Sequence, residues 1–154
     1  MRASVRRFSA LAAFAAWACT GYAGAGGEAA RVDGSALMGT WTNAAGARLD
    51  LKPEWRMQGE GLHDALAEGT SCPETVAGRW TFFSAPDHAG SSLADGRTTS
   101  GDHVALMVDE LDTPCALSAM VRRDGQGLNL CLVEDPDSDC SAEELLRPVN
   151  AMAE

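Results

Sequence analysis

The sequence predicts an all-β domain that closes into an eight-stranded antiparallel up-and-down barrel, preceded by a signal peptide and a flexible tether. From Ser35 onward, apolar and polar residues alternate in many places, which is typical of strands with one solvated face. The segments are joined mostly by short turns, and no pattern favours a helix longer than two turns. Consecutive antiparallel strands that must hide their edges tend to close into a barrel, so we expect that architecture.

The expected strands follow one another along the chain. The stretch 47–52 alternates most clearly, and 76–83 has the strongest β propensity because it carries Trp80, Phe82 and Phe83. A strand over 55–61 would place Trp55 and Met57 on one face. The full set of expected strands is 37–42, 47–52, 55–61, 76–83, 103–108, 115–122, 128–133 and 144–148.

Turns and loops separate these strands. Ala44-Ala45-Gly46 and Asp124-Gly125-Gln126-Gly127 read as hairpin turns. Two longer loops cover 62–72 and 84–102, and the second is rich in Gly, Ser, Asp and Thr, which predicts mobility. A single helical turn fits 65–68, and 141–146 is compatible with either helix or strand.

The first 18 residues have the pattern of a secretory signal. Arg2, Arg6 and Arg7 form a basic start, and 8–18 is apolar except for Ser9. Eleven residues of helix rise only about 16 Å, short of a hydrocarbon core about 30 Å thick. We therefore expect an export signal rather than a membrane-spanning helix.

Two cleavage sites compete. Ala16-Trp17-Ala18-Cys19 resembles a bacterial lipobox, in which Cys19 becomes the lipid-modified first residue. Ala23-Gly24-Ala25 is a small-x-small site that would release a soluble secreted protein. Because Cys19 directly follows the apolar run, we favour the lipoprotein. That choice places the protein on the outer face of the cell membrane, held by a lipid on Cys19.

Charge excludes one class of partner. The 154 residues carry a net charge of −10, and loss of residues 1–18 leaves 9 basic and 22 acidic residues, a net charge of −13. Nucleic-acid binding needs a basic face, so we expect none. An anionic membrane would repel the domain, so the lipid must supply attachment. Residues 19–34 are rich in Gly and Ala and predict a tether, with the barrel domain at 35–150.

The four remaining cysteines predict two disulfides. Cys72, Cys115, Cys131 and Cys140 are an even number in an exported chain, and four cysteines allow three pairings. Cys131 and Cys140 flank one hairpin, so their pairing would be local. Cys72 with Cys115 would then join the start of the expected strand at 76–83 to the start of the expected strand at 115–122. The sequence alone does not choose among the pairings.

Aromatic residues either line or fill the barrel. Trp55, Met57, Trp80 and Phe82 are candidates for the wall of a cavity that holds a small apolar ligand. In a body this small, filling of the interior is the favoured alternative, because little volume can stay empty.

The pattern resembles the lipocalin-like (calycin) barrels. Gly39-Thr40-Trp41 lies on the first expected strand and Arg147 at the end of the last. The resemblance implies a barrel floor made by Gly39, Trp41 and Arg147, with the guanidinium across the indole. The chain is also similar to small uncharacterised lipoproteins of GC-rich bacteria, which share Gly78-Arg79-Trp80 and the 135–138 turn. The Thr-Asp-Tyr loop of true lipocalins is absent.

Catalytic and metal motifs are missing from the sequence. It has no Gly-x-Ser-x-Gly elbow, phosphate loop, Cys-x-x-Cys or His-Glu-x-x-His pattern. The carboxylates of 135–139 fail the calcium-loop pattern because Cys140 and Leu146 occupy its Gly and Glu positions. His63, His88 and His103 have no metal-ligand spacing. We therefore expect no cofactor, metal or catalytic residue.

The function expected from the sequence is non-enzymatic binding of a small apolar ligand or an envelope partner. The alternative is a small secreted enzyme or enzyme inhibitor acting through the loops at 62–72 and 84–102. That alternative requires a histidine to lie within reach of acid–base partners.

Overall fold

A computed structural model describes residues 27–66, 72–86, 91–109, 115–132 and 139–149. The expected signal peptide, Cys19, His88 and the 135–138 turn lie outside the described residues.

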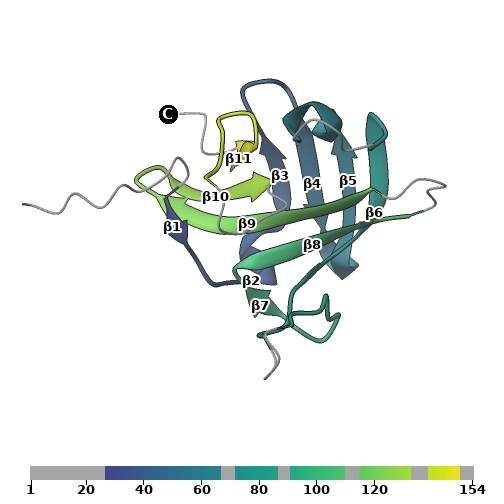
Figure 1. Ribbon diagram of the computed structural model, residues 1–154, viewed down its shortest axis with the longest axis vertical. Helices are drawn as coiled ribbons and strands as arrows, with labels where there is room; N and C mark the ends of the chain where they lie inside the picture. Colours follow the sequence, from purple (N-terminus) through teal and green to yellow (C-terminus); the bar gives the residue numbers. More distant parts are fainter. Residues whose placement is uncertain (1–26, 67–71, 87–90, 110–114, 133–138, 150–154) are drawn as a thin grey trace, which may run out of the picture.

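Eight strands form a closed antiparallel barrel, which confirms the predicted fold class (Figure 1). Each strand pairs with the next, and the last pairs with the first, so the order is up-and-down. The eight are β3 (Gly39–Thr42), β4 (Arg48–Lys52), β5 (Arg56–Glu60), β6 (Thr75–Phe82), β8 (His103–Val108), β9 (Ala116–Asp124), β10 (Gly127–Leu132) and β11 (Leu145–Pro148). In Figure 1, β8 to β10 cross β3 to β6 at a large angle, as tilted strands of a small barrel do.

Helical structure is limited to short 3₁₀ turns within the described residues. These are η1 (Gly34–Ala36), η2 (Pro53–Trp55) and η3 (Leu62–Ala65). The helix-or-strand segment at 141–146 resolves into a turn followed by β11.

Three short strands were not expected. β1 (Glu28–Ala29) pairs with β9, while β2 (Val32–Asp33) pairs with β7 (Ser100–Gly101) in a separate two-stranded sheet. The end of the expected tether is therefore structured from 28 to 34. Part of the 84–102 loop is paired as well, and Arg31 strengthens that contact by donating to the Ser100 carbonyl at 3.2 Å. Strands of two residues leave no alternation to read in a sequence.

The core follows the predicted alternation. On β4, Leu49 and Leu51 are buried while Arg48 and Lys52 are exposed. Buried residues also face one another on neighbouring strands: Leu51 of β4 lies opposite the buried Met57 of β5. The barrel wall therefore turns one apolar face inward from each strand.

The β4–β5 hairpin differs from its prediction. Trp55 belongs to η2 rather than to the start of β5, and both Glu54 and Trp55 have a φ of 60°. A strand residue has negative φ, so Trp55 does not alternate with Met57 as expected. It packs into the barrel end instead.

Two disulfides are present, as expected, and the structure fixes the pairing that the sequence left open. Cys72 pairs with Cys115 across 43 residues, and Cys131 pairs with Cys140 across 9 residues. The first borders the main core, and the second forms a separate cluster with Met120 and Leu145.

Candidate functional site

The candidate ligand-lining residues pack against one another. Trp55 and Trp80 have ring centroids 4.6 Å apart, and Phe82 lies 6.3 Å from Trp55 and 6.0 Å from Trp80 at steep angles. Trp80 and Phe82 are fully buried and Met57 is 2% exposed. Tilted and edge-on rings at these distances are favourable packing geometry. These side chains therefore fill the barrel rather than surround an open space.

One end of the barrel is covered by the segment that enters it. A methyl group added at Gly34 would lie 2.9 Å from the Trp55 ring, so η1 rests directly on the aromatic cluster. Leu37 follows, fully buried, and its carbonyl accepts a hydrogen bond from the Trp41 indole at 2.8 Å. Gly101 of β7 likewise lies close to Phe82, since a methyl group added there would be 2.7 Å from the Phe82 ring. The small β2–β7 sheet, seen below the barrel in Figure 1, thus helps to cap this end.

The opposite end is covered by η3. Leu62 is fully buried and Ala65 is 2% exposed. A methyl group added at Gly59 would lie 2.4 Å from Leu62, so the missing side chain on β5 gives Leu62 its place. The barrel is therefore closed at both ends by buried apolar residues.

Of the residues expected to form the barrel floor, Trp41 is buried in the core but Arg147 does not lie across its ring. Gly39 and Trp41 lie on β3, with Trp41 buried at 2% exposure, and Arg147 lies on the neighbouring β11. The register pairs Pro148 with Trp41 and Arg147 with Thr42. Alternation therefore turns Arg147 to the opposite face from Trp41.

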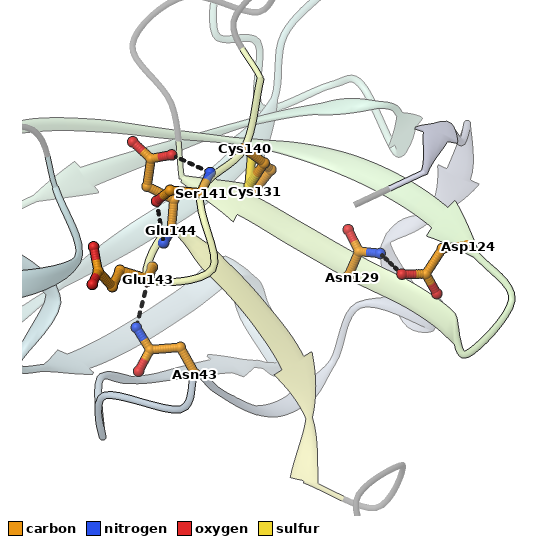
Figure 2. Close-up of a disulfide and its surroundings, with 8 residues drawn as sticks. All are labelled: Asn43, Asp124, Asn129, Cys131, Cys140, Ser141, Glu143 and Glu144. Atoms are coloured by element: carbon orange, nitrogen blue, oxygen red, sulfur yellow. Dashed lines mark hydrogen bonds between the residues drawn. A yellow bond between two sulfur atoms is a disulfide. The ribbon is translucent and has the colours of Figure 1, made fainter. Parts of the chain in front are cut away.

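The guanidinium of Arg147 binds Asp124 instead of the Trp41 ring. Its Nη2 lies 2.6 Å from Oδ2 of Asp124, and its Nη1 lies 3.3 Å from Oδ1. Asn129 donates to the same carboxylate at 3.2 Å, as Figure 2 shows. This ion pair, which replaces the expected stacking, joins the last strand to the β9–β10 turn. Sequence spacing gave no sign of it because the two residues are 23 apart.

Asp124→Asn is expected to lower the free energy of unfolding by about 1–2 kcal/mol, because it breaks a bidentate pair that is only about one-fifth exposed. The hydrogen bond from Arg147 lowers the Asp124 pKa below 3.8. Because this pKa is lower in the folded protein than in the unfolded chain, the ionised Asp124 carboxylate stabilises the fold at pH values above 3.8. That stabilisation is lost as the pH falls through the folded-state pKa. Urea titration at pH 7 and pH 3 measures both effects. Asp50→Asn is the matched control, since Asp50 pairs with the more exposed Arg48 and should lose less.

The two described histidines have separate local partners. His63 of η3 lies 3.0 Å from Asp64, and His103 of β8 stacks on Phe83 with centroids 4.2 Å apart. Burial lowers the His103 pKa below 6.5, opposed by the charge of Asp102. No described acid–base partner other than a chain neighbour lies in salt-bridge contact with either imidazole.

We expect the fold to lose stability as the pH falls through 6.5. Because the folded-state pKa of His103 is below its unfolded value, the unfolded chain takes up the proton first. The urea midpoint should therefore drop between pH 7.5 and pH 5.5 in the wild type. His103→Gln should flatten that drop, while His63→Gln should retain it. An unchanged drop in His103→Gln would contradict the assignment.

The grooves formed by the described residues lie on the barrel's outer wall and rim. One of about 370 Å³ runs over the outer faces of β4, β5 and β6, and its lining includes Arg48, Asp50 and Thr75. A second, of about 460 Å³, lies where β3 nears β10 and includes Met38 and Leu128.

A local polar network lies next to the second disulfide (Figure 2). The Ser141 amide donates to the Glu144 carboxylate at 2.7 Å, and the Glu144 amide donates to the Ser141 hydroxyl at 3.2 Å. This reciprocal pair fixes the turn that follows Cys140 and precedes β11. The Asn43 amide adds a hydrogen bond to the Glu143 carbonyl, tying the turn to β3's hairpin.

The described residues contain no group of three or more His, Cys, Asp or Glu side chains placed to hold a metal ion. Within the same residues, no helix has the length and apolarity needed to cross a bilayer.

The fold and its contacts define a closed antiparallel barrel consistent with lipocalin-like architecture, with a packed interior. No protein-family model, curated protein or solved structure matches the chain.

Proposed function

We propose that the protein is an exported, lipid-anchored, non-enzymatic binding module that contacts an envelope partner through its outer surface. The observation that carries this proposal is the packed interior: Trp55, Trp80 and Phe82 occupy the space where a small apolar ligand would lie in a hollow barrel. Binding by such a molecule must use its outer wall or rim, where the grooves are found.

Anchoring by Cys19 is supported by the sequence pattern at positions 16–19. The net charge of −13 after loss of residues 1–18 would keep the domain away from an anionic membrane. A lipid anchor with a tether would hold it nearby without a membrane-binding face. The stretch at 28–34 is structured and so does not belong to that tether.

Fractionation of the native host tests the anchor. We expect the wild-type chain in the membrane fraction and Cys19→Ser in the soluble fraction, with a lipid-modified Cys19 as the mature N-terminus. Met38→Ser is the control, because Met38 is an exposed apolar residue outside the signal. A mature chain that begins at Gly26 and is soluble would contradict the anchor and favour cleavage after Ala25.

Native mass spectrometry of the same purified material tests the binding mode. We expect the mass of the lipid-modified chain with two disulfides and no tightly bound apolar molecule. A stoichiometric apolar ligand would contradict a filled interior.

A further inference from the structure

Three cations stand in one row across the outer face of the barrel. The register places Lys52 of β4 opposite Arg56 of β5, and Arg56 opposite Arg79 of β6. All three are exposed. Neighbouring strands lie about 4.8 Å apart, so like charges sit side by side, an arrangement that destabilises a sheet. We call Lys52, Arg56 and Arg79 the cation row.

The rest of this wall matches its charges. Four residues before Lys52 on β4, Arg48 lies opposite Glu60 and forms an ion pair with Asp50 at 3.1 Å. In the cation row, Lys52 donates to the neutral Gln58 amide and forms no ion pair with a carboxylate of the residues that the structure describes. No carboxylate of the described residues forms an ion pair with Arg56 or Arg79. Cations that have no ion-pair partner among the described residues of a strongly acidic chain indicate a role outside the fold.

The backbone is strained at the same place. The hairpin that joins Lys52 to Arg56 holds Glu54 and Trp55 at a φ of 60°, a region that side chains other than glycine rarely adopt. Contact of Trp55 with Trp80 keeps the turn in this shape. Strain held by surrounding packing is common at functional sites, and here it coincides with charge repulsion.

A groove of about 340 Å³ adjoins the cation row. Its lining includes Lys52, Arg56, Ala77, Gly78 and Asp109. A methyl group at Gly78 would lie 2.0 Å from the Met107 carbonyl, so only glycine fits there. Ala77 is exposed and lies opposite Gln58, so only a methyl group projects there on the outer face of β6.

We propose that the cation row binds a slender, linear anion carrying phosphate groups. A phosphate offers three acceptor oxygens in different directions and can accept hydrogen bonds from two cations about 4.8 Å apart, whereas a carboxylate has two coplanar oxygens. Asp50, Glu54 and Asp109 border the row, so a broad anionic surface would meet like charge. A narrow chain along the row would meet fewer of these carboxylates. The proposal rests on the proposed function, because it supplies the chemistry of that outer-surface partner.

Calorimetry of the purified full chain with inorganic tripolyphosphate tests this assignment. We expect binding whose affinity falls with salt, with a slope of log K against log salt of about −2, as three cation–phosphate contacts predict. Arg56→Gln and Arg79→Gln should each weaken binding about tenfold at 50 mM salt and make the slope shallower by about 0.7. Their urea midpoints should equal or exceed that of the wild type, because each substitution relieves repulsion.

Arg97→Gln is the matched control, since Arg97 is an exposed cation on the segment after β6, outside the row. It should leave affinity and slope unchanged. Equal losses in all three variants would mean that only overall charge acts, and would overturn the site. Binding of hexaglutamate at least as tight as tripolyphosphate would overturn the phosphate assignment in favour of an acidic peptide. Absence of tripolyphosphate binding overturns the cation row alone, since fractionation and native mass spectrometry test the anchor and the filled interior separately.

Discussion

Trp80→Ala is expected to lower the free energy of unfolding by about 3–5 kcal/mol, among the largest effects of any single substitution in this chain. Trp80 is fully buried, contacts two aromatic rings and donates its indole hydrogen to the Lys52 carbonyl at 3.2 Å. Truncation would leave a cavity at the barrel end and remove the hydrogen bond to the Lys52 carbonyl.

Urea unfolding followed by circular dichroism measures this loss. Met38→Ala is the control, because Met38 is 43% exposed and should change stability by less than about 0.5 kcal/mol. If Trp80→Ala cost no more than Met38→Ala, the aromatic cluster would not be the centre of the core.

Removal of the Cys72–Cys115 disulfide is expected to cost about 4 kcal/mol. In the chain-entropy model, a cross-link across 43 residues restricts the unfolded chain more than one across 9 residues. The same model gives about 2.6 kcal/mol for Cys131–Cys140. The longer bridge also borders the main core, where Cys115 is 8% exposed.

The two double variants provide each other's comparison. Cys72→Ala with Cys115→Ala should unfold at a clearly lower urea concentration than Cys131→Ala with Cys140→Ala. Equal midpoints, or the reverse order, would contradict the view that the longer loop carries more of the stabilisation.

The barrel was predictable because its signals are periodic and local. Alternation over 47–52 and 128–133 identifies β4 and β10 closely, and 103–108 coincides with β8. Strand edges must be paired, so eight such segments imply closure. Among the candidate cavity residues, Met57, Trp80 and Phe82 are buried, whereas Trp55 is partly exposed in a turn.

The features that the sequence did not predict depend on pairing between residues far apart along the chain. β1 and β2 consist of two residues each, and their pairing with β9 and β7 comes from contacts far along the chain. The partner of Arg147 depends on register: a shift of one residue would have faced it toward Trp41. The cation row escaped notice for the same reason, because Lys52, Arg56 and Arg79 become neighbours only once three strands are aligned.

Xenon binding provides a direct test of whether the barrel interior is filled. Apolar cavities in proteins take up xenon, so crystals of the wild-type chain under xenon pressure should show no xenon inside the barrel. Leu106→Ala, which truncates a side chain 2% exposed on β8, is the positive control and should gain an interior site. Xenon bound among Trp55, Trp80 and Phe82 in the wild type would show a hollow barrel and contradict the account.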